Sequence, residues 1–209
     1  MKNLMILILS LSITALWAQQ PVEHISKLEL GKKDKKVFHA SRDSSAVIHI
    51  DTLIMKDRSS LQFYGKHDVK LVVKYAEIGD RVFISGRGRQ NNASDIDIHM
   101  NIQKLGSLYV IAKGEDAFNG TKTHPNGDGG DVNFTYSSQG IVPQSTDKKG
   151  KNYLFIDAQP GGLRVNASSE VQQIYSMINV APTGLRGIPQ GQIYSGSPGT
   201  EGKVVVRSE

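Results

Sequence analysis

Hydrophobic and polar residues alternate along most of the chain after residue 46. In the clearest run, 95–102, four apolar side chains alternate with polar ones. A period of two places successive side chains on opposite faces of a strand, one in a core and the other in solvent. Shorter runs predict further strands at 47–51, 61–63, 69–73, 82–84 and 108–110. Since only 170–180 could form a short helix, the sequence predicts an all-β fold.

The spacing of these runs separates the possible all-β architectures. Strands recur at intervals of roughly ten to fourteen residues, which suits a sandwich, a barrel or a β-solenoid. The Asn-Gly and Asp-Gly loops typical of tight hairpins are nearly missing between the early strands, whereas the alternating segment 76–86 places glycine at corners. We therefore expect a parallel β-helix (β-solenoid), with an antiparallel β-sandwich as the alternative.

Glycine becomes frequent in the second half of the chain. It recurs from Gly114 to Gly130, and again from Gly196 to Gly202 near the end. A collagen triple helix needs uninterrupted glycine at every third position, and here the period lasts two steps. The pattern predicts turns or polyproline-II-like segments packed against the last coils, where glycine permits a close approach of backbones.

The chain divides into three segments. Met1–Ala18 has a lysine, an apolar run and a small final residue, as in a secretory signal peptide, and Pro21 follows it. We expect a charged lead-in over 19–46 and a single β domain over 47–209. The expected location is outside the cytoplasm, in the periplasm or associated with the outer membrane, with no membrane span after cleavage.

Composition narrows the chemistry further. The chain has no cysteine, which excludes thiolate catalysis, zinc–thiolate sites and acylation through cysteine. The formal net charge of +5 favours anionic partners such as acidic glycans. Nucleic acid is a poor fit, because the charge is diffuse and the chain is expected to be exported.

The strongest polar constellation lies on the predicted strand 95–102. The period of two places Asp95, Asp97 and His99 on one face, where they could bind a cation or act as acid and base. Arg87 and Arg89 precede them and could hold an acidic sugar, which loosely resembles the sites of β-helical polysaccharide lyases. A solvated strand face explains the same row without function, so we assign these five residues to binding only and predict no metal, cofactor or catalytic residue.

Aromatic side chains provide a second candidate surface. Phe83 and Tyr109 are expected to point away from the core side of their strands, as is Phe155 if its neighbours point inward. Three exposed rings would form a patch for carbohydrate or protein. Burial under a loop or a second sheet is the alternative.

Three segments resemble exported glycine-rich β-coil proteins of Gram-negative bacteria that carry the type 9 secretion system. These are the coil at 76–86, the block 105–110 with 130–134, and the closing stretch 198–206. The resemblance implies an envelope protein built from β-coils and brings no catalytic residue. It also implies a possible role for a compact periplasmic subunit, which could dock on or plug an outer-membrane channel.

These observations favour action by contact. We expect a non-catalytic exported protein whose partner is an outer-membrane or envelope protein, with an anionic glycan as a further ligand. The alternative is a β-helical carbohydrate-binding protein or acidic-polysaccharide lyase that uses Arg87, Asp95, Asp97 and His99.

Overall fold

The computed structural model describes residues 22–39, 45–117, 124–163 and 198–209. The expected signal peptide, Met1–Ala18, and the possible helix at 170–180 lie outside these ranges. Within them every regular element is a strand and no helix occurs, as the alternation predicts. We likewise find no helix in the described ranges with the length and apolar character that a membrane span requires.

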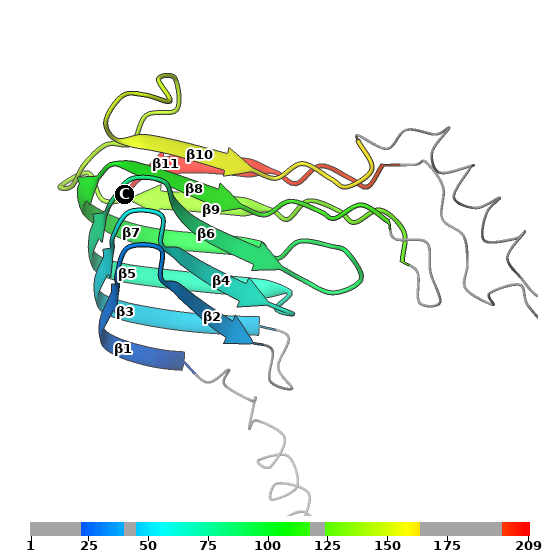
Figure 1. Cartoon of the computed structure of the whole chain (residues 1–209), viewed down its shortest axis with the longest axis horizontal. Helices are drawn as coiled ribbons and strands as arrows, with labels where there is room; N and C mark the ends of the chain where they lie inside the picture. Colours follow the sequence, from blue (N-terminus) through cyan, green and yellow to red (C-terminus); the bar gives the residue numbers. More distant parts are fainter. Residues whose placement is uncertain (1–21, 40–44, 118–123, 164–197) are drawn as a thin grey trace, which may run out of the picture.

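The strands form two fully parallel sheets that face each other (Figure 1). The six-stranded sheet contains, in order, β1 (Val22–Leu30), β3 (Ser45–Met55), β5 (Asp68–Ile78), β7 (Asp95–Leu105), β9 (Val132–Tyr136) and β11 (Val204–Ser208). The five-stranded sheet contains β2 (Lys35–His39), β4 (Ser60–Tyr64), β6 (Val82–Arg87), β8 (Ser107–Ile111) and β10 (Tyr153–Asp157).

The chain winds as a parallel β-solenoid. Consecutive strands lie in alternate sheets, so each strand pairs with the one two places earlier in the chain. Among the described strands none pairs with its immediate successor, as the hairpins of an antiparallel sandwich would require. The β-solenoid prediction is confirmed, and the sandwich alternative is wrong.

Repeated corners hold the coils in register. Lys33, Arg58 and Arg81 each adopt a positive φ, of 67°, 61° and 56°, between a long strand and the short strand that follows it. The backbone N–H of Lys33 donates to Asp57 of the next corner at 3.0 Å, and Arg58 donates to Asp80 at 2.8 Å. The corners therefore stack on one another by backbone hydrogen bonds, just as the strands do.

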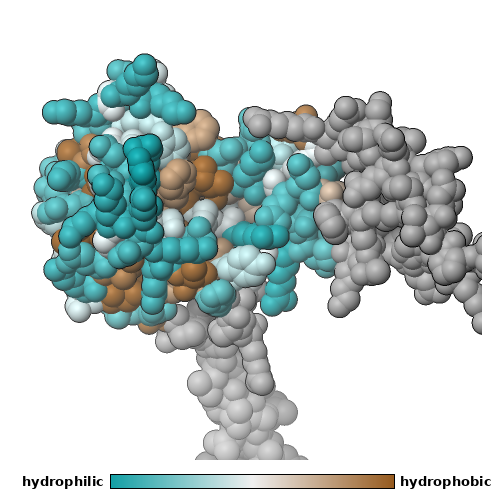
Figure 2. All heavy atoms as spheres, in the orientation of Figure 1, coloured by the Kyte–Doolittle hydropathy of each residue, from teal (hydrophilic) through white to brown (hydrophobic). Residues whose placement is uncertain are grey.

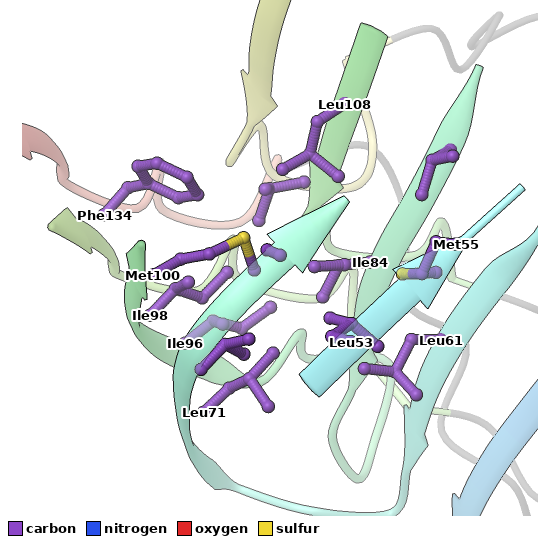
Figure 3. Packing of buried hydrophobic residues seen from close by; sticks show 14 of the residues in the cluster. Leu53, Met55, Leu61, Leu71, Ile84, Ile96, Ile98, Met100, Leu108 and Phe134 are labelled. Atoms are coloured by element: carbon purple, nitrogen blue, oxygen red, sulfur yellow. The ribbon is translucent and has the colours of Figure 1, made fainter. Parts of the chain in front are cut away.

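The core consists of the inward side chains of both sheets. Parallel pairing stacks Ile48, Leu71, Ile98 and Phe134 in one column across β3, β5, β7 and β9, and all four are buried. Leu53, Leu61, Ile84 and Leu108 are among the residues that fill the same layer (Figure 3). Complete burial of one such side chain contributes about 1.5–3 kcal/mol, so these columns are the main source of stability.

The first coil occupies part of the expected charged lead-in. β1 and β2 lie within 19–46, and they pair in register with β3 and β4. The alternation of polar and apolar residues does not reveal this coil, because two of its inward positions carry charged residues. Glu23 continues the inward column of Ile48, and Lys36 continues that of Leu61. Both charged side chains are exposed, since no coil covers them from below within the described part of the chain.

The coils lengthen toward the glycine-rich half. Equivalent corner positions are 23 residues apart at Asp57 and Asp80, 36 apart at Asp95 and Asp131, and 72 apart at Asp131 and Lys203. The added residues form two excursions that extend beyond the end of the sheets (Figure 1). Each has an outgoing and a returning extended segment: 112–117 and 124–131 in the first, 158–163 and 198–203 in the second. These segments belong to no strand and lie side by side.

Glycine allows the extended segments to pack backbone against backbone. The N–H of Gly127 donates to Glu115 at 2.9 Å, and its carbonyl accepts from Gly161 at 2.9 Å. A Cβ on Gly127 would lie 1.8 Å from the carbonyl oxygen of Asn91, and one on Gly161 would lie 2.0 Å from that of Glu115. The predicted role of glycine in close backbone approach is confirmed for these residues.

The substitution Gly127→Ala tests this packing. We expect the free energy of unfolding to fall by about 1–3 kcal/mol or more, because a methyl group cannot fit against a backbone carbonyl without displacing the segment. Gly150→Ala is the control, since a Cβ there meets only the side chain of Asp147. Urea unfolding measures both variants, and an equal small effect would contradict the account.

Candidate binding surface

The outer face of the five-stranded sheet carries a row of aromatic rings. Phe83, Tyr109 and Phe155 occupy the same register position in β6, β8 and β10. Their ring centroids are 5.1 Å apart between Phe83 and Tyr109 and 6.0 Å apart between Tyr109 and Phe155. Phe83 is 38% exposed and Phe155 40% exposed, so the predicted outward direction is confirmed.

The geometry of this row determines what it can bind. Phe83 and Tyr109 stack with an interplanar angle of only 23°, so they cover each other's faces and leave ring edges toward solvent. Tyr153, which is itself buried, meets Tyr109 edge-on at 5.8 Å and helps to hold its ring in place. A rigid apolar strip on a flat sheet favours association with another apolar surface. Figure 2 shows a visible face that is mostly hydrophilic and carries several hydrophobic patches.

A groove lies on the same outer face and runs from β2 across β4 and β6 to the end of β8. It has a volume of about 490 Å³, with Gln62 and Ser85 among its lining residues and Lys35 and Lys113 contributing positive charge. An adjoining hollow of about 580 Å³ shares Tyr64 with it and adds the backbone turn after β6. The aromatic row and the groove thus lie on one face of the molecule.

The two arginines predicted for binding belong to this groove region. Arg87 forms an ion pair with Glu115 and places its guanidinium carbon 5.3 Å from the centre of the Tyr64 ring. Arg89 lines the adjoining hollow beside His124. Because Glu115 balances the charge of Arg87, the net positive charge of the region comes from its other basic side chains.

The acidic candidates lie on the opposite face. Asp95, Asp97 and His99 are on β7, with side chains on the outer face of the six-stranded sheet, as the period of two predicts. The structure does not bring them together with Arg87 and Arg89. Strands β6 and β7 are neighbours in sequence but belong to different sheets, so their outward side chains point in opposite directions.

Hydrogen bonds within the coil account for much of this acidic row. Asp95 Oδ1 accepts the backbone N–H of Asp131 at 2.8 Å, and Asp131 Oδ1 accepts that of Lys203 at 2.7 Å. Asp97 Oδ1 lies 3.3 Å from His99 Nε2. Asp95 and Asp131 therefore join successive coils at their corners.

Sequence reasoning missed one cluster at this corner. His67 Nδ1 lies 3.0 Å from Asp68 Oδ1, and the two groups share a site with Asp95 in which the ligand atoms lie within 4.8 Å of one another. The hydrogen bond to the Asp68 carboxylate raises the pKa of His67 above its ordinary value. Only the register between β5 and β7 brings Asp68 beside Asp95, and no local motif encodes it.

Substitution of Asp68 tests the cause of this pKa. We expect Asp68→Asn to lower the pKa of His67 toward the ordinary value of about 6.5. Asp51→Asn should leave it unchanged, because Asp51 pairs with Lys74. A raised pKa means that the pair stabilises the fold at pH values below about 6.5 and that this contribution is lost as the pH rises through the pKa of the folded state.

NMR titration of the imidazole resonances measures the pKa directly. The effect on stability should be small, because both side chains are well exposed and water screens their charges. An unchanged pKa of His67 in Asp68→Asn would show that the hydrogen bond has no such effect.

Comparison of the chain with models of protein families, with characterised proteins and with solved structures finds no match. The aromatic row and the basic groove are therefore the features that indicate a function.

Proposed function

We propose that this protein is a non-catalytic, exported protein of the cell envelope that acts by contact with another protein. The contact surface is the outer face of the five-stranded sheet. The exposed aromatic row of Phe83, Tyr109 and Phe155 is the observation that carries this proposal, because aromatic residues at the centre of an interface supply most of its binding energy.

The chemistry of the surface defines a matching partner. The row is apolar, the groove on the same face contains Lys35 and Lys113, and the adjoining hollow contains Arg89. A complementary protein would present an apolar patch with an acidic rim, since opposite charges at the rim speed association and fix its orientation. The resemblance to proteins of bacteria with the type 9 secretion system adds a finer proposal: the partner is an outer-membrane secretion channel that this subunit docks on or plugs.

The separation of the acidic and basic candidates supports contact over catalysis. A lyase that used Arg87 with Asp97 and His99 would need them around one substrate, whereas they lie on opposite outer faces. In addition, Asp95 is engaged by the N–H of Asp131.

Photo-crosslinking in the native envelope tests the protein contact. A photoreactive phenylalanine analogue at Tyr109 should crosslink to one defined envelope protein, and the same analogue at Val72 on the other sheet should not. Alanine at Phe83 and Tyr109 together should weaken binding of the identified partner by about 30-fold or more, as expected for loss of about 2 kcal/mol. Equal crosslinking from both faces, or binding unaffected by the alanines, would contradict the proposal.

The basic groove supports a second candidate, an acidic glycan. Lysine and arginine beside the Tyr64 ring suit a chain of uronate sugars. If this candidate is correct, polygalacturonate should bind, binding should weaken with salt, and Arg89→Gln with Lys113→Gln should reduce the affinity about tenfold or more. Binding should survive Asp97→Asn, while neutral dextran serves as control.

Two results would contradict glycan binding without turnover. Equal affinity for dextran would remove the role of charge. Release of unsaturated uronate, lost in Asp97→Asn, would instead identify a lyase.

A further inference from the structure

The two ends of the solenoid differ in chemistry. At the end formed by β1 and β2, Glu23 continues the column of Ile48 and Lys36 continues that of Leu61. Both side chains are exposed. Charges at inward positions oppose the stacking of another coil, because burial would remove them from water. Ile25, Leu28 and Leu30 fill the other inward positions of β1, so Glu23 and Lys36 are the features that oppose a further coil at this end.

The end formed by β11 is apolar. Val204 and Val206 continue the inward columns of Val132 and Phe134, which are fully buried. The two valines themselves remain 44% and 47% exposed. No strand pairs with the outer edge of β11 in the described part of the chain. The hydrophobic core thus reaches the surface at this end.

The backbone at this edge is oriented for strand addition. The N–H of Val132 donates to the carbonyl of Lys203 at 2.8 Å, which directs that carbonyl toward β9. In a parallel ladder the direction alternates from residue to residue, so the N–H and C=O groups of Val204 and Val206 face the open edge. The same two residues provide both the apolar side chains and the hydrogen-bonding groups.

We propose that a second copy of this chain covers the edge, with β11 of the two copies paired antiparallel about a two-fold axis. Stacking of unlike ends, with β11 of one copy against β1 of the other, is disfavoured because it would bury Glu23 against the valines. A two-fold axis joins like ends and closes the assembly at a dimer. With Val206 on the axis, Lys203 of one copy stands opposite Glu209 of the other, and such cross-strand pairs of opposite charge are favourable.

This dimer is independent of the function proposed above. It uses the edge of the six-stranded sheet, whereas the aromatic row lies on the outer face of the other sheet. A dimer would present two such faces, so binding to a partner would gain from two linked contacts.

Sedimentation velocity of the purified full chain over a range of concentrations tests the proposal. We expect a reversible dimer and a dissociation constant raised about tenfold or more by Val206→Lys, since lysine on an edge strand blocks pairing. Val22→Lys is the matched control, because Val22 is 46% exposed on the edge strand β1 at the opposite end. A monomer at all concentrations, or a dimer unaffected by Val206→Lys, would overturn the proposal.

A cysteine crosslink tests the register and does not depend on how well Val206→Lys folds. The chain has no cysteine of its own, so a single introduced thiol gives an unambiguous result. Paired residues on the axis have Cα atoms about 5.5 Å apart, within the range of a disulfide. Val206→Cys should form covalent dimers under mild oxidation and Val22→Cys should not; equal crosslinking of the two would overturn the two-fold arrangement.

Discussion

Parallel pairing in register between successive coils is the interaction on which the whole molecule depends. It places apolar residues of successive coils directly above one another. Ile48, Leu71, Ile98 and Phe134 therefore form one continuous apolar column. The same pairing stacks the corners and aligns Phe83, Tyr109 and Phe155 into a row. The core and the candidate binding surface are therefore two faces of one repeat, and any shift of register would disturb both.

The glycine-rich half follows the same logic with a different contact. There the coils grow from 23 to 72 residues, and extended segments carry the extra length away from the sheets. Backbone groups take over the role of side chains, because glycine lets a carbonyl approach where a methyl group would clash. Aspartates at the corners, such as Asp131 with the N–H of Lys203, tie these long excursions back into register.

The sequence predicts what depends on local periodicity. Alternation identified the strands β3 to β8, the all-β fold and the outward direction of Phe83 and Tyr109, and glycine spacing indicated close backbone packing. It could not predict what depends on pairing between coils. Charged Glu23 hid the first coil, and the separation of Arg87 from Asp97 follows from the assignment of β6 and β7 to different sheets. The pairing of His67 with Asp68 and Asp95 likewise spans two coils.

Proton–proton contacts between strands test the central claim most directly. Nuclear Overhauser effects should connect Ile48 with Leu71 and Leu71 with Ile98 across a parallel ladder, in the pattern of β3, β5 and β7. A hairpin arrangement would instead give close α-proton contacts between β3 and β4, because antiparallel partners bring Cα atoms to about 4.5 Å. The first set of contacts is the result we predict, and the second would contradict the solenoid and everything derived from it.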